Sequence, residues 1–136
     1  MNPILLDTHV VIWAAENGLR PELTRRVEAA AARSELLISP ISAWEIGMLI
    51  RRERLSLSFA PEEYVRVLFS QRGVILAALT PTIALAAAML PRKPIADPAD
   101  RILIATATAY GAHFMTSDRK IQDYAKNATH LRCIAC

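Results

Sequence analysis

Apolar stretches of two kinds alternate along this chain of 136 residues. Short continuous apolar runs, typical of buried strands, alternate with longer stretches in which apolar residues recur at helical spacing. The short runs predict strands at residues 3–6, 36–38, 74–79, 113–116 and 131–135. The intervening stretches predict helices at residues 8–14, 22–33, 41–53, 61–72, 82–90, 97–110 and 119–124.

This alternation predicts an α/β domain with a mostly parallel sheet. The strand runs are continuously apolar instead of alternating with polar residues, so we expect helices on both faces of the sheet. The chain has no internal repeat, low-complexity segment or linker-like stretch, and its length suits a single domain over residues 1–136.

Composition supports a folded domain and argues against a membrane protein. Hydrophobic residues make up 53% of the chain and charged residues 21%, which allows a sizeable core and disfavours disorder. No apolar run approaches the roughly 20 residues that a membrane-spanning helix needs. No basic segment precedes the first apolar run, as a secretory signal would require. We therefore expect no membrane association and a cytoplasmic location.

Four acidic residues lie next to or inside apolar stretches: Asp7, Glu45, Asp100 and Asp118. Asp7 directly follows the first predicted strand, and Asp118 lies two residues after the fourth. In open α/β sheets, ligands bind beyond the carboxyl ends of strands, so both positions suit a site. Each acid also has a simpler interpretation as the N-cap of the next helix.

Glu45 lies within a helical stripe formed by Ile41, Trp44, Met48 and Leu49. This spacing predicts a carboxylate that points toward the core. An isolated carboxylate there would lose stability or stay protonated. Partner arginines and a shared cation are the two ways in which its charge can be compensated.

Asp97 and Asp100 lie three residues apart at the start of the long apolar helix that ends near Tyr110. Asp97 precedes Pro98, which is the usual order of an N-cap and a first helical residue. We interpret Asp97 as the structural cap and Asp100 as the site acid. The reverse assignment remains an alternative.

Converging carboxylates need a compensating charge. Two unit charges about 4 Å apart repel by roughly 4 kcal/mol at an effective dielectric of about 20. Mg²⁺, with Mn²⁺ as a substitute, is a hard cation that prefers oxygen ligands and can activate water for phosphodiester hydrolysis. The formal charge is +3, and without these four acids the balance is 16 basic against 9 acidic residues, or +7. This distribution suits a protein that attracts a polyanion.

Four motifs together resemble PIN-domain ribonucleases, most closely the VapC toxins of bacterial toxin–antitoxin pairs. The motifs are Leu-Leu-Asp-Thr-His at 5–9, Ser-Ala-Trp-Glu-Ile at 42–46, Asp-Pro-Ala-Asp-Arg-Ile-Leu-Ile-Ala at 97–105 and Thr-Ser-Asp at 116–118. The similarity covers almost the whole chain in the expected order. Ile95 departs from the pattern, because many relatives have histidine at this position.

The resemblance implies a Mg²⁺-dependent endoribonuclease on a three-layer α/β/α sandwich with a five-stranded sheet. It implies that Asp7, Glu45, Asp100 and Asp118 are the catalytic and metal-binding acids, with Asp7 and Asp100 the firmest ligands. It also implies a homodimer, an RNA substrate and inhibition by a cognate VapB-like antitoxin. The RNA target, the cleavage site and the number of metals do not follow from the motifs.

Other residues have two open interpretations. Thr8 and Ser117 either contact the carboxylates or metal-bound water, or only cap helices. Arg101 either binds phosphate or pairs with a neighbouring acid. Trp13 and Trp44 fit core or groove-wall positions better than base-stacking positions.

The cysteine pair Cys133 and Cys136 has the spacing of redox and zinc motifs. A zinc site needs about four ligands, and the sequence has no second pair. We expect Cys133 to be a buried strand residue and Cys136 to be a tail residue without a role.

Two other classes of function fit an acidic α/β site less well. A phosphoacceptor signalling domain needs adjacent acids after its first strand and a lysine after its fifth, and this chain has neither. An Asp-x-Asp phosphatase is disfavoured because His9 occupies the second acidic position. A non-catalytic PIN-like domain that only binds RNA or a partner remains the main alternative.

Overall fold

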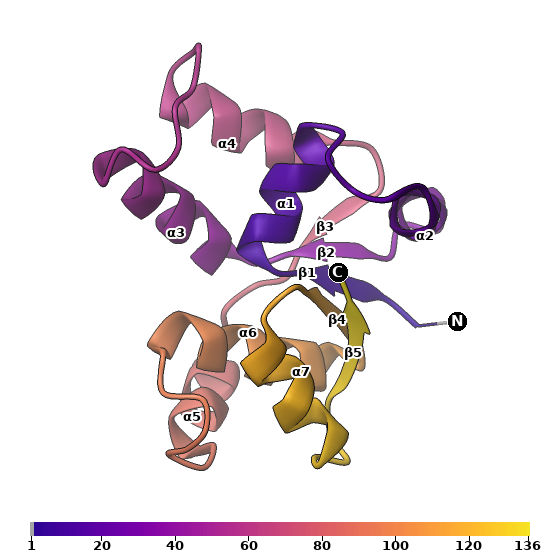
Figure 1. The fold of residues 1–136 in the computed structure, drawn as a ribbon, viewed down its shortest axis with the longest axis vertical. Coiled ribbons are helices and arrows are strands. Elements are labelled where there is room, and N and C mark those ends of the chain that lie inside the picture. The colour runs from indigo at the N-terminus through magenta and orange to yellow at the C-terminus, as the bar shows by residue number, and fades with distance from the viewer. Residues whose placement is uncertain (1) are drawn as a thin grey trace.

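Five strands form one sheet at the centre of the molecule (Figure 1). The computed structural model describes residues 2–136. The strands lie in the order β3-β2-β1-β4-β5, and every neighbouring pair is parallel. Their bounds are β1 Ile4–Leu6, β2 Leu36–Ile38, β3 Val74–Leu76, β4 His113–Thr116 and β5 Arg132–Ala135. The predicted parallel α/β sheet is confirmed.

Helices form a layer on each side of the sheet (Figure 1). One layer contains α1 Thr8–Ala15, α2 Pro21–Ala32, α3 Pro40–Arg51 and α4 Pro61–Ser70. The other contains α5 Pro81–Met89, α6 Pro98–Tyr110 and α7 Arg119–Lys126. Among residues 2–136, no helix combines the length and the apolar character that crossing a membrane requires. The three-layer α/β/α sandwich is confirmed.

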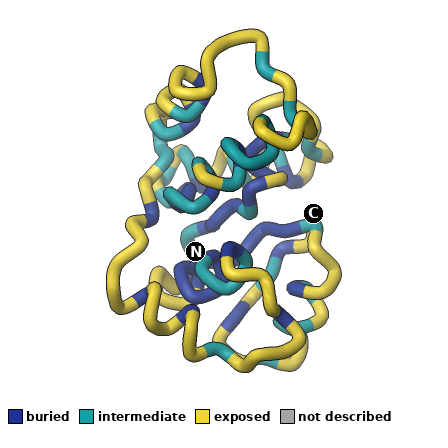
Figure 2. Tube along the Cα trace, turned by 90° about the vertical axis from the view of Figure 1, so that its left-hand side faces the viewer, coloured by how far each residue is buried: buried dark blue, intermediate teal, exposed yellow. Residues whose placement is uncertain are grey.

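The position of β1 at the centre of the sheet explains why its sequence is continuously apolar. Leu6 packs into a cluster with Val10 of α1, on one face of the sheet. Leu5 points to the other face and packs with Leu103 of α6 and with Phe114 of β4. These residues are almost fully buried, and each contributes roughly 1.5–3 kcal/mol of transfer free energy. Figure 2 shows the buried strands between exposed outer segments.

Proline and short polar side chains set where the helices begin. Five helices, α2 to α6, have proline in their first turn, where a missing N–H costs nothing. Ser39 caps α3 by accepting a hydrogen bond from the Ile41 N–H at 3.1 Å. Asp7 is the N-cap of α1 and Thr8 is its first helical residue, so the capping interpretation of Asp7 is confirmed and that of Thr8 is wrong.

Strand β3 differs from the prediction in length and in burial. It ends at Leu76 instead of residue 79, although the Ala77 N–H still donates to the Ile38 carbonyl at 2.9 Å. Ile75 and Leu76 are 40% and 53% exposed. The expectation that helices cover both faces of every strand is therefore wrong for β3, which lies at the edge of the sheet.

Candidate active site

The strand order places two of the predicted acids side by side. The chain leaves β1 toward β2 and β3 on one side and returns to β4 and β5 on the other, so the order reverses between β1 and β4. Asp7 follows β1, and Asp118 lies two residues beyond β4. This reversal is where open α/β sheets leave a crevice for ligands.

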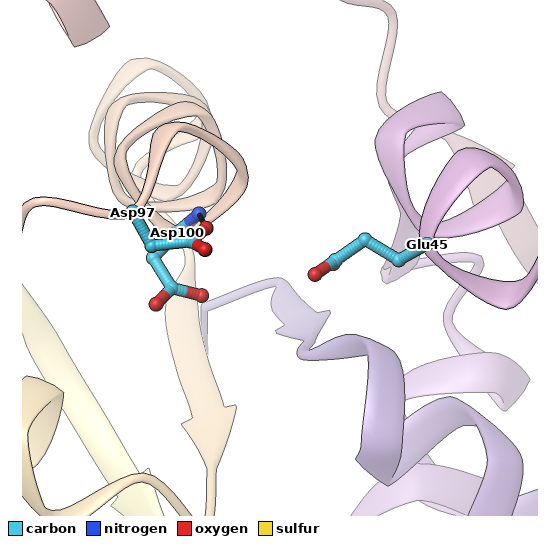
Figure 3. A group of neighbouring side chains, drawn as sticks. All are labelled: Glu45, Asp97 and Asp100. Carbon is cyan, nitrogen blue, oxygen red and sulfur yellow. Dashed lines mark hydrogen bonds between the residues drawn. The ribbon is translucent and has the colours of Figure 1, made fainter. Parts of the chain in front are cut away.

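Three carboxylates from two helices converge beside this crevice. Each of Glu45, Asp97 and Asp100 has a carboxylate oxygen within 4.8 Å of the other two. Figure 3 shows Glu45 extending from α3 toward Asp97 and Asp100 at the start of α6. Asp7 and Asp118 lie outside this 4.8 Å group.

Asp7 is half-buried, and both of its carboxylate oxygens accept hydrogen bonds. Its Oδ1 accepts from the Thr8 N–H at 2.8 Å, and its Oδ2 accepts from the Thr116 hydroxyl at 2.6 Å. Burial raises the pKa of Asp7, and these two hydrogen bonds oppose that effect without cancelling it. The geometry fixes the direction in which this carboxylate points.

Glu45 is oriented by hydroxyl groups. Its Oε1 accepts from the Thr8 hydroxyl at 2.5 Å, and the Thr8 and Ser42 hydroxyl oxygens are 2.9 Å apart. Burial raises the pKa of Glu45, and the charges of Asp7 and Asp97 raise it further.

The α3 helix faces the core with a different side from the one predicted. Ser42 and Ile46 are its buried residues, whereas Trp44 is 58% exposed. The expected core stripe is therefore wrong at Trp44, whereas Ile41 and Leu49 pack against the core as expected. Glu45 points into a cleft at the protein surface. A cavity of about 210 Å³ forms this cleft, and its lining includes Glu45, Asp97, Trp44 and Arg52. Trp44 is a groove-wall residue.

Asp100 has the most strongly shifted pKa among the acids of the site. Burial, followed by the charges of Asp97, Asp7, Glu45 and Asp118, raises its pKa to about 7. The other three acids of the predicted quartet thus all raise the pKa of Asp100. No lysine, arginine or histidine in residues 2–136 forms a salt bridge with any of these five acids. Partner arginines do not compensate them.

Asp118 lies at the periphery of the site and is exposed. It caps α7, since its Oδ1 accepts from the Lys120 N–H at 2.8 Å and the Ile121 N–H at 3.3 Å. Its own N–H donates to the Thr116 hydroxyl oxygen at 3.0 Å. The Thr116 side chain therefore connects Asp118 to Asp7.

The donor set of this cleft fits a hard divalent cation. All the acidic ligand atoms are carboxylate oxygens, which Mg²⁺ and Mn²⁺ prefer, and the convergent group contains none of the sulfur or imidazole ligands typical of zinc. The raised pKa of Asp100 reflects burial first and then repulsion by the neighbouring carboxylates, and such a cation would offset both effects.

The PIN domain family model matches residues 4–127 of this chain. The chain belongs to the PIN-domain family. It is 31% identical over 124 residues to "Ribonuclease VapC22" of Mycobacterium tuberculosis, an alignment that covers 91% of this chain and 93% of that protein.

Solved structures with low sequence identity share the fold of this PIN domain. VapBC2 from Rickettsia felis, bound to a DNA fragment from its promoter, has a TM-score of 0.70 at 15% identity and covers 97% of both chains. DNA-bound VapBC from Salmonella typhimurium has a TM-score of 0.67 at 22% identity, with 99% of this chain and 98% of that chain covered. A toxin–antitoxin complex from Klebsiella pneumoniae has a TM-score of 0.63 at 21% identity and covers 94% of both chains.

Sequence reasoning missed three contributors to this PIN-domain site. Asp97 caps α6 as predicted, with its Oδ1 accepting from the Asp100 N–H at 3.0 Å, but it also belongs to the convergent group. Thr116 and Ser42 are buried hydroxyl residues that orient the acids. The position of Thr116 at the carboxyl end of a predicted strand was the available signal. Thr8 makes one of its predicted contacts, with Glu45, whereas Ser117 makes no side-chain hydrogen bond within residues 2–136.

Arg101 has neither of its predicted roles. Its guanidinium donates to the carbonyl oxygens of Ala87, Ala88, Leu90, Pro91 and Ile95, at 2.5–3.1 Å. These carbonyls belong to the end of α5 and to the loop that leads to Asp97 and Asp100. Arg101 therefore stabilises the loop that positions two site acids. The Ile95 side chain is buried in the core, so the departure from the family pattern there lies outside the acidic cleft.

The two cysteines, Cys133 and Cys136, are both half-buried. Both are free, and no group of three or more metal-ligating side chains found in residues 2–136 includes either of them. Cys133 lies in β5, where burial raises its thiol pKa to about 11, so the reactive thiolate is scarce near neutral pH.

We expect replacement of Arg101 by lysine to lower the free energy of unfolding by about 2–3 kcal/mol, because an ammonium group has only three donors and lacks the planar fork. Urea denaturation measures this change. Arg92→Lys in the same loop is the matched control, since Arg92 is exposed and has no side-chain hydrogen bond within residues 2–136. Its effect should stay within about 0.5 kcal/mol. Equal changes in the free energy of unfolding for the two variants would contradict the role of Arg101 in stabilising the loop.

The metal-free protein should lose stability as pH rises. The folded state binds the Asp100 proton more tightly than the unfolded chain does, because an aspartate carboxyl has an ordinary pKa of 3.8. The stabilising effect of that proton is therefore fully present below about pH 4 and is lost as pH rises to about 7. In EDTA, Asp100→Asn should reduce this fall by on the order of 2 kcal/mol, a value lowered to allow for solvent screening of a half-buried group. Urea denaturation between these pH values tests this; a wild-type stability that rises over the interval contradicts it.

Proposed function

We propose that this PIN-domain protein is a metal-dependent endoribonuclease toxin of a toxin–antitoxin pair, which hydrolyses RNA phosphodiester bonds in the cytoplasm. The observation that carries the proposal is the convergence of Glu45, Asp97 and Asp100 beside Asp7 at the reversal of strand order. The similarity to a protein named as a ribonuclease, over 91% of this chain, supports the reaction class.

Mg²⁺ is the proposed cofactor, with Mn²⁺ as a substitute. Asp7, Glu45, Asp100 and Asp118 are the proposed catalytic and metal-binding acids, and the geometry adds Asp97 to this set. When bound, the cation would neutralise the carboxylates and activate water for attack on phosphorus.

The protein's own residues would prepare the site in three ways. The Thr116 and Thr8 hydroxyls hold Asp7 and Glu45 in fixed directions, so little ordering remains to be done when a ligand binds. Asp100, with a pKa of about 7, exchanges its proton near neutral pH. Arg52 at the wall of the cleft would attract the phosphate backbone, whose approach the carboxylates alone would oppose.

We infer two protein partners. One is a cognate VapB-like antitoxin, in keeping with the toxin–antitoxin and VapBC complexes whose fold this chain shares. The other is a second copy of this chain, forming a homodimer. Exposed apolar side chains on β3 and α5, where a monomer would leave them in water, support an interface of this kind; they include Ile75, Leu76, Leu85 and Met89.

Removal of a single site carboxylate should abolish RNA cleavage. We expect Asp7→Asn and Asp100→Asn to lower the cleavage rate at least about 100-fold, more than the loss typical for residues that only support a metal ligand. Asp123→Asn is the matched control, because Asp123 is an exposed acid of α7 paired with Lys126. The assay follows cleavage of total RNA in Mg²⁺ and in EDTA.

Full cleavage activity in EDTA would refute metal dependence. RNA binding without cleavage by the wild-type protein, at every Mg²⁺ and Mn²⁺ concentration, would favour the non-catalytic alternative.

Asp97→Asn separates helix capping from a role in the metal site. Asparagine is as good an N-cap as aspartate, so the free energy of unfolding should change by less than about 0.5 kcal/mol. If Asp97 takes part in the metal site, the Mg²⁺ concentration that gives half-maximal cleavage should rise about tenfold. Unchanged Mg²⁺ dependence would restrict Asp97 to capping.

A further inference from the structure

A second, basic cavity shares no lining residue with the acidic cleft. It measures about 620 Å³ and lies between the start of α2 and strands β4 and β5. Arg20 and Arg26 line it from the helix side, and His113 and Arg132 line it from the sheet. We call this cavity, defined by these four residues, the β5 groove.

The sheet register explains why basic side chains gather there. His113 and Arg132 are direct neighbours across the β4–β5 pair, so their side chains lie on the same face. Two residues further along the strands, Met115 and Ile134 lie on that face too, and both pack into the core beneath α1. The groove therefore lies next to the part of this face that α1 covers, between the sheet and α2.

The positive charge of the groove is only partly compensated. Arg20 faces Glu22 at 3.6 Å, in a pair that is mostly exposed and therefore weak. Within residues 2–136, neither Arg26 nor Arg132 forms a salt bridge with an acid. Both arginines are close enough for their charges to lower the pKa of His113, in addition to the effect of its burial.

The groove follows β5 toward the acidic site. From Arg132 to Ala135 the strand advances about 10 Å, at about 3.3 Å per residue. At its far end, the Arg20 guanidinium lies 3.5 Å from the Ala135 carbonyl oxygen. The next residue, Cys136, donates its N–H to the Thr116 carbonyl at 3.0 Å. Thr116 is the residue whose hydroxyl holds Asp7.

We propose that the β5 groove binds the sugar-phosphate backbone of the RNA substrate and leads the strand toward the acidic cleft. This inference rests on the proposed function. Guanidinium groups donate in pairs to phosphate oxygens, and a positive groove that follows a single strand is a common form of sequence-independent RNA binding. The contacts position the RNA, and they do not select a base sequence.

The salt dependence of RNA affinity tests the groove without relying on cleavage. Fluorescence anisotropy of a labelled single-stranded RNA, in EDTA and between about 50 and 200 mM salt, gives the slope of log affinity against log salt. Each phosphate contact contributes about 0.7 to the magnitude of that slope for a single strand. Arg26→Gln should reduce the slope by about 0.7, and Arg26→Gln combined with Arg132→Gln should reduce it by about 1.4.

Arg25→Gln is the matched control. Arg25 is the neighbour of Arg26 on α2, is equally charged and exposed, and does not line the groove. Its removal should leave the slope unchanged. Arg132→Lys keeps the charge on β5, so it should retain most of the slope that the single variant Arg132→Gln loses. The melting temperature of each variant shows whether a loss of slope comes from unfolding instead.

An unchanged slope in the double variant, in protein that still cleaves RNA, overturns the groove and leaves the proposed function intact. The proposal is also overturned if the double variant binds RNA as the wild-type protein does but loses the wild-type affinity for a poly-glutamate peptide. The groove would then be a site for an acidic protein. Absence of both RNA binding and RNA cleavage in the wild-type protein overturns the groove and the proposed function together.

Discussion

Repulsion among carboxylates that the fold forces together is the constraint on which this structure depends. Asp7, Asp97 and Asp118 occupy the N-caps of α1, α6 and α7, so the positive ends of three helix dipoles point at the site. Each such interaction is worth roughly 0.3–1 kcal/mol. The helix ends and the hydroxyls of Thr8 and Thr116 allow the acids to approach one another. The pKa of Asp100 is raised first by burial and then by the charges of the other acids, so their repulsion is not fully compensated.

The capping and functional interpretations of these acids are therefore compatible. Asp7 and Asp97 each accept a backbone N–H at the start of a helix, as a cap does, and each also lies in the acidic neighbourhood. Sequence patterns alone present the two roles as exclusive. The carboxylate has two oxygens, and capping uses only one of them.

Local patterns predicted most of the fold because the strands are short, apolar and bounded by turn residues. Residues 36–38 and 113–116 were predicted with the observed bounds. The failures have physical causes that lie outside local sequence. Ile75 and Leu76 look like core residues, and only the strand order reveals that β3 is an edge. Helical periodicity places Trp44 and Glu45 on one side of α3, but it does not tell whether that side faces a core or a cleft.

The sequence indicated most of the acids around the cleft, but few of the residues that support them. Asp7, Glu45 and Asp100 stand out because a carboxylate in an apolar stretch is unusual. The five carbonyl partners of Arg101 come from a loop whose path no pattern describes, so its role emerged only in three dimensions. Thr116 supports Asp7 across 109 positions of sequence, a separation that periodicity cannot bridge.

The two edge strands of the sheet, β3 and β5, differ in the side chains that they expose. Strand β3 presents Ile75 and Leu76 to solvent, whereas β5 presents the charged side chain of Arg132, which discourages the stacking of further strands. In the proposed homodimer, contact through β3 of both copies would leave only the two β5 edges free, and the charge of Arg132 disfavours the addition of a further strand there.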